Sequence, residues 1–363
     1  MIKNSKKKYI IPLIAAVLLL QGCTDKEAET KAVTNSTVET AEEERSEGES
    51  RGTILEEKLE KEEEKREEEE ALQTKAAGIT FIDDIGRNVT VASHDRVITM
   101  IGSFTDIWLL AGGEVAGAAN DSWDSFDLNL SADVVNIGSH VEPDIEKIIA
   151  ANPDLVIASA NTDADLKMEK LLTESGITVA YFSVSNFNEY LNMLDICTDI
   201  TGRKDLYARN GTEVQKQVDA ARELVNRRNL EGKEAPEIVF LRASASSIKA
   251  KGSYGNVGGE MLADLGCVNI ADDDSSSLLD DLSMEAIIAA DPDFIFVTTQ
   301  GNDADAVQQN IEETLLNNPA WNSLSAVKNG RYFVLEKELY NLKPNARWGE
   351  AYQKLADILY GEE

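Results

Sequence analysis

The sequence contains little cysteine and little histidine, and both scarcities limit what the protein can be. Its 363 residues include 3 Cys and 2 His. A receptor for bare zinc or manganese needs several converging His, Cys or carboxylate ligands, so we expect no protein-bound metal site. With Cys23 assigned to a lipid (below), we expect Cys197 and Cys267 to be free and buried in separate parts of the fold.

Basic residues are also scarce, with 35 Lys and Arg against 66 Asp and Glu and a formal net charge of −31. Nucleic-acid binding requires a basic face, so the charge argues against a nucleic-acid partner. An anionic ligand would need a local basic cluster that works against the overall negative field.

No apolar run is long enough to cross a bilayer, because Tyr9–Leu20 falls short of the roughly 20 residues required. Lys3 and Lys6–Lys8 precede this run and Gly22-Cys23 follows it, which is the order of a secretory signal peptide. The ending resembles the lipobox of bacterial lipoproteins, which implies a signal peptide at 1–22 and a Cys23 lipidated with fatty acids such as palmitate. An ordinary signal peptide or a membrane anchor is the alternative.

Residues 23–77 have few apolar side chains and many Glu, Ser and Thr, and they include the run LEEKLEKEEEKREEEE. Such a segment cannot bury enough surface to offset the entropy of ordering, so we expect an acidic tether. Its second half pairs Glu and Lys at helical spacing and is predicted to be an exposed helix. A coiled coil is disfavoured because Leu55, Leu59 and Leu72 do not sustain a heptad seam.

Catalytic motifs are also missing. The sequence has no G-x-S-x-G and no Walker A motif. An S-x-x-K stretch at Ser246–Lys249 lies directly beside Lys251-Gly252-Ser253, whereas the hydrolases that use such motifs separate them widely. With no visible nucleophile–base pair, we predict a binding protein and not an enzyme.

One segment occurs twice. Residues 144–159 read DIEKIIAANPDLVIAS and residues 283–298 read SMEAIIAADPDFIFVT, and in both the Glu lies seven residues before the Pro. The copies are too far apart for a repeat array, whose period is about 20–50 residues. We therefore predict two similar lobes with a ligand cleft between them, because domain interfaces favour pockets.

Alternating buried-strand and helical patterns fill both halves, which predicts an α/β fold with mostly parallel sheets. The predicted boundaries are a first lobe at 78–202, one long interlobe helix at 203–230 and a second lobe at 231–363. Because one rigid helix is a stiff connector, we expect limited closure of the lobes.

These motifs resemble those of the helical-backbone substrate-binding proteins of ABC importers. The resemblance rests on TFIDDIGRNVTV, RVITMIGSFTDIWLLAGGEVAG, both copies of the repeat and NPAWNSLSAVKNGRYFVL, and covers residues 78–360. It implies two Rossmann-like lobes joined by a helix, a lipid-anchored monomer on the outer face of the cytoplasmic membrane, and partners in a permease dimer and its ATPase. It also implies an iron(III)–siderophore ligand or, alternatively, haem or cobalamin, with no intrinsic cofactor. A surface sensor or interaction lipoprotein on this fold is the alternative from another class.

The resemblance also gives Glu146 and Glu285 a role. The matching Glu of each lobe pairs with arginines of the permease in this family, so the pair is predicted to dock the receptor on its partner. The simpler interpretation is that each Glu stabilises its helix start by about 0.3–1 kcal/mol.

Candidate ligand contacts follow from the rule that ligands lie beyond the carboxyl ends of parallel strands. With a strand at 96–101, a helix from Thr105 and a loop at 243–255, the rule selects these candidates: Ser103, Phe104, Thr105, Trp123, His140, Arg242, Lys249, Lys251, Tyr254, Tyr340 and Arg347. It also places Gly102, Ser122, Asp124, Ser139, Thr299, Gln300, Lys343 and Trp348 on the rim.

The chemistry of this set suits an anionic chelate. Arg242, Lys249, Lys251 and Arg347 would hold carboxylate or catecholate oxygens, and Trp123, Tyr254, Tyr340 and Trp348 would supply flat walls. Each could equally be a solvated loop charge or a core residue. Haem would require an axial ligand, for which the candidates are His140, Tyr254, Tyr340 and Met100.

Overall fold

The computed structural model describes residues 78–273 and 283–361. The predictions for the signal peptide, Cys23 and the acidic tether lie outside these residues. Within the described ranges, no helix is both long and apolar enough to span a membrane. Cys197 and Cys267 are free and buried, as predicted.

The first lobe is built on a five-stranded sheet in which every neighbouring pair is parallel. Its strands, in spatial order, are β5 (Val135–Asn136), β4 (Gly117–Ala118), β3 (Val97–Thr99), β8 (Leu155–Ser159) and β9 (Thr178–Phe182). β3 and β8 are buried at every position, which is why they appear in the sequence as continuous apolar runs.

Two small antiparallel ribbons accompany this sheet: β1 (Ile79–Ile82) with β2 (Asn88–Val91), and β6 (Gly138–Ser139) with β7 (Glu142–Pro143). The helices of the lobe are α2 (Gly102–Leu110), α3 (Asp121–Asp124), α4 (Ile145–Ala150), α5 (Asp163–Glu174) and α6 (Phe187–Thr201). α6 begins where the Asn186 side chain accepts a hydrogen bond from the Glu189 backbone N–H, and ends at Gly202, whose φ of +70° favours glycine.

Helix α2 begins at Gly102, so the predicted start at Thr105 is wrong. Ser103, Phe104 and Thr105 therefore occupy its first turn, and the Thr105 N–H already donates to Ile101 O. The Thr105 hydroxyl bonds to Thr99 at 2.6 Å and to Ser122 at 2.8 Å inside the lobe. The sequence misplaced this start because Ile101 carries no side-chain cap.

The second lobe is built on β10 (Glu237–Ala243), β13 (Phe294–Thr299), β14 (Tyr332–Leu335), β11 (Ile248–Lys251) and β12 (Val268–Asn269). All pairings are parallel except β10–β11, which is antiparallel. The prediction of a loop at 243–255 is therefore wrong in its middle, where β11 forms a hairpin with β10. Ile248 and Ala250 are buried and alternate with the more exposed Lys249 and Lys251, the period of a strand with one buried face.

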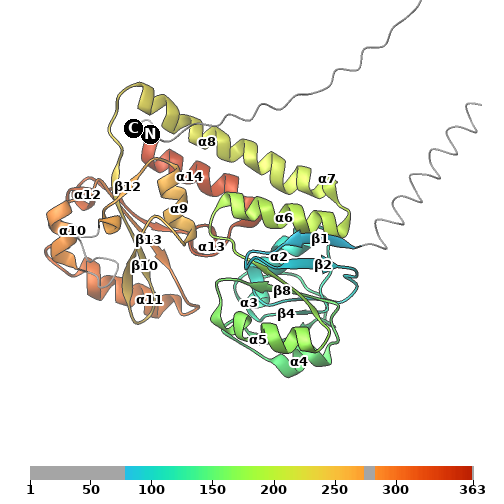
Figure 1. Cartoon of the computed structure of the whole chain (residues 1–363). Coiled ribbons are helices and arrows are strands. Elements are labelled where there is room, and N and C mark those ends of the chain that lie inside the picture. The colour runs from blue at the N-terminus through green and yellow to red at the C-terminus, as the bar shows by residue number, and fades with distance from the viewer. Residues whose placement is uncertain (1–77, 274–282, 362–363) are drawn as a thin grey trace, which may run out of the picture. The chain divides into compact units, whose positions relative to one another are not determined.

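The remaining helices of this lobe surround the sheet (Figure 1). They are α9 (Val257–Asp264), η2 (Ile270–Asp272), α10 (Met284–Ala290), α11 (Ala304–Ile311), η3 (Glu312–Leu316), η4 (Trp321–Ser323), α12 (Ser325–Lys328), α13 (Lys337–Tyr340), η5 (Asn345–Arg347) and α14 (Trp348–Tyr360).

The repeated segment has the same local structure in both lobes. The residue before each Pro, Asn152 and Asp291, has a positive φ of 48° and 46°, which ends α4 and α10. The next Asp then accepts from the start of the neighbouring strand: Asp154 from the backbone of Arg96 and Asp293 from Glu237. The Pro-Asp pair is thus a device that aims each chain into its strand.

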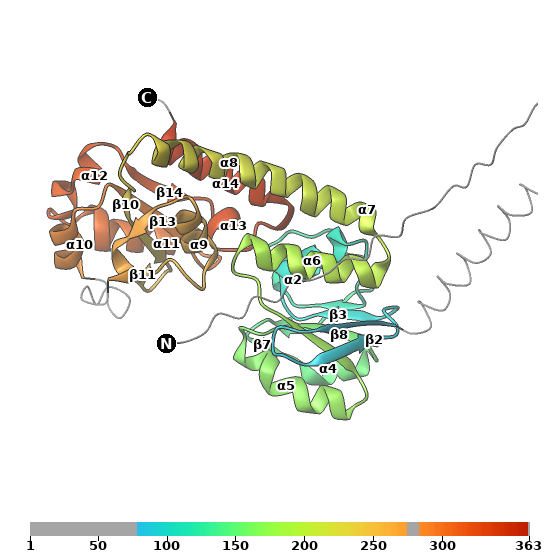
Figure 2. The ribbon, with the colours of Figure 1, turned by 45° about the horizontal axis from the view of Figure 1, so that its top comes forward.

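Between the lobes, α7 (Lys204–Tyr207), the π-helical η1 (Ala208–Thr212) and α8 (Glu213–Leu230) follow one another without a break. α14 runs beside α8 in both views (Figures 1 and 2). Its Trp348 contacts Phe187 and Tyr190 of α6, with ring centroids 6.0 and 6.4 Å apart. Packing through α14, not foreseen from the sequence, therefore adds a second connection between the lobes.

Candidate functional site

A cavity of about 420 Å³ lies between the lobes. The first lobe lines it with the start of α2, with α3 and with β6; the second lobe lines it with the ends of β10 and β13 and with residues of α13 and the segment after it. A smaller cavity of about 170 Å³ shares Arg242, Asn341 and Lys343 with the first and adds Lys251 and Tyr340. The two cavities are adjoining parts of one cleft.

The second-lobe wall is cationic. Arg242, Lys251, Lys337 and Lys343 line the cleft, and none of the described second-lobe residues adds a carboxylate to it. Among the described residues none of the four forms an ion pair; Lys337 donates instead to Gly301 O and to the Asn302 side chain. In a chain as acidic as this one, four such cations form a local site for an anion.

Arg242 and the β11 lysines repel one another. Arg242 pairs directly with Lys249 across β10 and β11, and Lys251 projects from the same face of the hairpin. Burial lowers the pKa of Arg242. Burial, and then the charges of Arg242 and Lys249, lower the pKa of Lys251. The hairpin therefore concentrates positive charge, which a bound anion would stabilise.

Lys343 reaches into the cleft from the segment after α13. Its Nζ lies 5.5 Å from the ring centroid of Phe104. Burial lowers the pKa of Lys343 to about 8, although the charges of Asp121 and Glu189 act in the opposite direction. This lysine is therefore charged at neutral pH and begins to lose its proton just above it.

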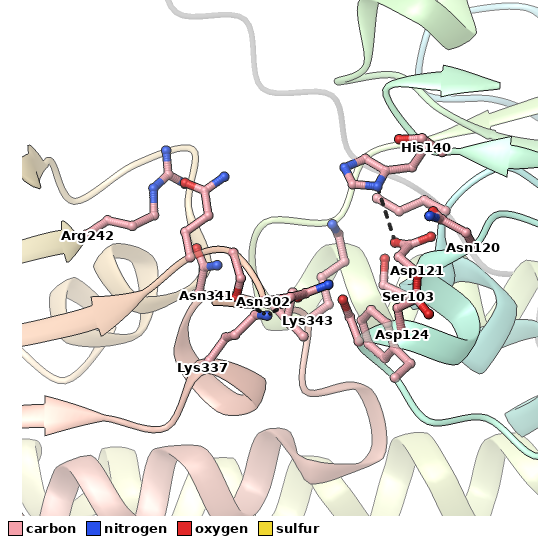
Figure 3. A pocket seen from close by; sticks show the side chains of 17 residues that line it. Ser103, Asn120, Asp121, Asp124, His140, Arg242, Asn302, Lys337, Asn341 and Lys343 are labelled. Carbon is pink, nitrogen blue, oxygen red and sulfur yellow. Dashed lines mark hydrogen bonds and ion pairs between the residues drawn. The ribbon is translucent and has the colours of Figure 1, made fainter. Parts of the chain in front are cut away.

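The first-lobe wall is polar and partly acidic, with Ser103, Asp121, Asp124 and His140 facing the cavity (Figure 3). His140 Nδ1 lies 3.7 Å from Asp121 Oδ2. Burial raises the pKa of Asp121, and the Gly102 N–H and the His140 charge oppose that rise. Ser103 Oγ and Asp121 Oδ1 are buried without a hydrogen-bond partner.

Asn345 fixes the segment that carries Lys343 to the first lobe. Its Nδ2 donates to Ser103 O at 3.0 Å and to Asp106 Oδ2 at 2.7 Å. Asn345 is fully buried and has a φ of +50°, a conformation that costs non-glycine residues energy. These bonds place the second-lobe lysine beside the first turn of α2.

The structure brings five of the predicted contacts to the cleft: Ser103, His140, Arg242, Lys251 and Tyr340. The others lie elsewhere. Phe104 and Thr105 are buried inside the first lobe, as Trp348 is in the packing of α14. Trp123 and Lys249 line neither cavity, and Tyr254 is 79% exposed. Arg347 binds Glu350 at 2.7 Å on the surface.

Several lining residues were not selected from the sequence. Asn120 and Asp121 follow β4, Lys337 follows β14, and Asn341 lies after α13. The strand-end rule reaches Asp121 and Lys337 once the ends of β4 and β14 are known. β4 has only two residues, so the sequence showed its end poorly.

Of the candidate axial ligands for haem, only His140 is placed to serve. Met100 is fully buried, Tyr254 lies outside the cleft, and the Tyr340 hydroxyl donates to Ala351 O. In the part of the chain that the structure describes, no three His, Cys, Asp or Glu side chains converge on a metal position.

Glu146 and Glu285 are both exposed in the first turn of their helices, α4 and α10. Asp144 caps α4 and Ser283 caps α10, each through a side-chain oxygen that accepts a backbone N–H. Neither Glu forms an ion pair with any described residue, so each lobe presents one unpaired carboxylate at equivalent positions.

Comparison with known proteins identifies the family. The model of the periplasmic binding protein family matches residues 97–339, and the chain belongs to this family. The family resemblance drawn from the sequence is thereby confirmed. The prediction of a substrate-binding protein and not an enzyme is confirmed as well.

The individual relatives share only about a quarter or less of their residues with this chain. The Fe(3+)-citrate-binding protein YfmC of Bacillus subtilis is 24% identical over 71% of this chain and 78% of its own. The structure of Staphylococcus aureus SirA complexed with staphyloferrin B has a TM-score of 0.57 and 20% identity, over 78% of this chain and 97% of SirA. The periplasmic haem-binding protein RhuT of Roseiflexus sp. RS-1, in apo form, has a TM-score of 0.58 and 22% identity, over 74% and 98%.

Proposed function

We propose that this protein is the receptor of an ABC importer, exported and anchored by lipid at Cys23, and that it captures an iron(III) chelate with anionic oxygens. The observation that carries the proposal is the cluster of Arg242, Lys251, Lys337 and Lys343, which line the cleft and form no ion pair with any described carboxylate. Guanidinium and ammonium groups in a partly buried site bind carboxylate and catecholate oxygens strongly.

The relatives support the same ligand class. One is named for binding ferric citrate, and another was solved with staphyloferrin B. Both names indicate chelates and not bare metal. The cleft of this chain agrees with a chelate, because its polar groups suit the ligand's oxygens and do not form a metal cage.

Delivery to a permease is proposed to depend on Glu146 and Glu285. One unpaired carboxylate per lobe at equivalent positions suits a two-lobed receptor that lands on a symmetric partner with basic sites. The packing of α14 against α6 and α8 supports a receptor that presents both carboxylates at a nearly fixed spacing. We propose that it works as a monomer.

Haem is the second candidate ligand. His140 lines the cavity with its side chain 40% exposed, whereas the hydroxyl of Tyr340, the other candidate axial ligand in the cleft, donates to Ala351 O. The cationic wall would then hold the haem propionates. Binding accompanied by a Soret shift that His140→Ala abolishes would favour this candidate over a ferric chelate.

A fluorescence titration tests the proposal. The chain from residue 23, with Cys23→Ser to prevent lipidation, is titrated with ferric citrate, a ferric hydroxamate, a ferric catecholate, haem and cobalamin, and with each iron-free chelator. We expect sub-micromolar saturation by one ferric complex, well within the range of specific sites. Saturation by haem or cobalamin alone would show that the ligand is not a ferric chelate of this kind. If no compound of the panel binds, a sensor or interaction role is favoured.

A further inference from the structure

The two walls of the cleft carry opposite charge (Figure 3). Of the residues that line it, the first lobe contributes the carboxylates of Asp121 and Asp124 and no Lys or Arg. The second-lobe residues that the structure describes contribute four cations and no carboxylate. A ligand that is anionic all round would meet favourable charge on one side and carboxylates on the other.

The acidic wall also has buried polar atoms that lack a hydrogen-bond partner. Ser103 is 2% exposed and its Oγ has no hydrogen-bond partner. Asp121 is 9% exposed, and its Oδ1 likewise has none. Buried polar atoms in folded proteins are almost always paired, so two unpaired acceptors on one cavity wall indicate a missing donor.

The neighbouring side chains of the protein do not supply that donor. His140 lies 3.7 Å from the other oxygen of Asp121, Oδ2, and leaves Oδ1 open. Lys343 acts on Asp121 through its charge, and no described cation forms an ion pair with Oδ1. The Gly102 N–H, which opposes the rise in the pKa of Asp121, also leaves Oδ1 without a hydrogen bond, so the donor must come from whatever occupies the cavity.

We propose that the ligand is a zwitterionic ferric chelate, whose carboxylates contact the second-lobe cations and whose protonated amine binds Ser103 and Asp121, with Asp124 at the rim. This inference rests on the proposed function and narrows it to carboxylate chelators that carry a free primary or secondary amine. The amine donates to Asp121 Oδ1 and Ser103 Oγ, while the second-lobe wall neutralises the iron-binding end. The first-lobe wall thereby selects among anionic chelates that the cationic wall alone would accept.

The test compares two probes that differ at a single amine, which is charged in one and neutral in the other. The first is the ferric complex of citrate amidated on one arm with ethylenediamine, which leaves a free primary amine; the second is the same complex with that amine acetylated. Both are titrated into the wild type, Asp121→Asn, Asp124→Asn and Asp127→Asn by calorimetry at pH 7. Asp127 is the matched control because it is an exposed aspartate three residues beyond Asp124 that does not line the cleft.

We expect the wild type and Asp127→Asn to prefer the free amine by about tenfold or more, since a charge-assisted hydrogen bond is at stake. In Asp121→Asn the preference should fall to about twofold or less, and Asp124→Asn should lie between. A wild type without preference, or an Asp121→Asn variant that keeps it, overturns the inference while leaving a ferric-chelate receptor intact. If neither probe nor any ferric complex of the panel binds, the proposed function fails as well. Thermal unfolding of each variant shows whether a lost preference for the amine results from a folding defect. Asp124 is exposed, so Asp124→Asn should unfold at the wild-type temperature.

Discussion

Arg242 and Lys249 lie directly opposite each other across the antiparallel pair of β10 and β11, although like charges in that position repel. Only Arg242 lines the cleft; Lys249 is exposed beside it. The pair is therefore a local cost in the empty protein that an anion bound at Arg242 would offset.

Two matched substitutions test this relationship. Arg242→Gln should weaken the binding of an anionic ferric chelate by about tenfold to a hundredfold, because a charge-assisted contact is lost. Lys249→Gln removes the same charge from the same face but should change affinity by about twofold or less. Both should raise the free energy of unfolding of the empty protein by a few tenths of a kcal/mol, since each relieves the repulsion. Equal losses of affinity in calorimetry would show that only the summed charge matters.

Affinity should also depend on pH through Lys343. Its pKa of about 8 means that the ammonium is present below this value and is lost as the pH rises through it. If binding requires the charged form, the affinity for an anionic chelate should fall by up to about tenfold between pH 7 and pH 9. Bound anion would in turn raise the pKa of Lys343.

Lys343→Arg is the control for this pH dependence, because arginine stays protonated across the whole range. The same ferric complex is titrated into both proteins in the same buffers, so changes in the complex itself cancel. Parallel pH profiles for the two proteins would exclude Lys343 as the titrating group.

Asn345 should contribute both to stability and to the cleft. Asn345→Ala removes the bonds to Ser103 and Asp106 and keeps the strained φ, so it should cost about 2–4 kcal/mol in urea unfolding. Asn345→Gly also loses the bonds but adopts a positive φ freely, and should be more stable than the Ala variant by about 1 kcal/mol.

Both variants free the segment that holds Lys343 and should weaken chelate binding. Equal stability of the Ala and Gly variants would show that the backbone relaxes there. Unchanged affinity in both would mean that Lys343 does not need this anchor.

The carboxylates of Glu146 and Glu285 should matter for uptake and not for binding. Glu146→Ala with Glu285→Ala should abolish uptake of the radiolabelled ferric complex in cells that carry the importer, because both docking contacts are lost. Affinity of the purified double variant should equal that of the wild type. Alanine at Glu174 and Glu313, two exposed acids on other helices, is the matched control. Normal uptake by the double variant would refute the docking role.

Most of the fold could be predicted from the sequence, because buried parallel strands and the duplicated Glu–Pro-Asp segment leave clear patterns. The start of α2 and the strand β11 could not: Ile101 gives no capping signal, and Ile248–Lys251 is too short a run to stand out. Site residues could be predicted only where a long strand marks its own end in the sequence. Arg242 follows a long strand and was found, whereas Asp121 follows the two-residue β4 and depends on a tertiary pairing for its place.

The contact between α14 and α6 lies beyond sequence reasoning altogether. Trp348, Phe187 and Tyr190 are apolar enough to be core residues, but nothing local indicates that they meet one another. That packing fixes how the two walls of the cleft face each other. It depends on contacts between residues far apart in the sequence, so no local pattern predicts it.

The most direct test of the account is a crystal structure of the protein grown with whichever ferric complex saturates it in the titration panel. We predict that the chelate lies between the two walls, with its anionic oxygens within hydrogen-bonding distance of Arg242 and Lys343 and its far side against Ser103 and Asp121. A chelate bound outside this cleft, or one whose oxygens avoid the second-lobe cations, would contradict it.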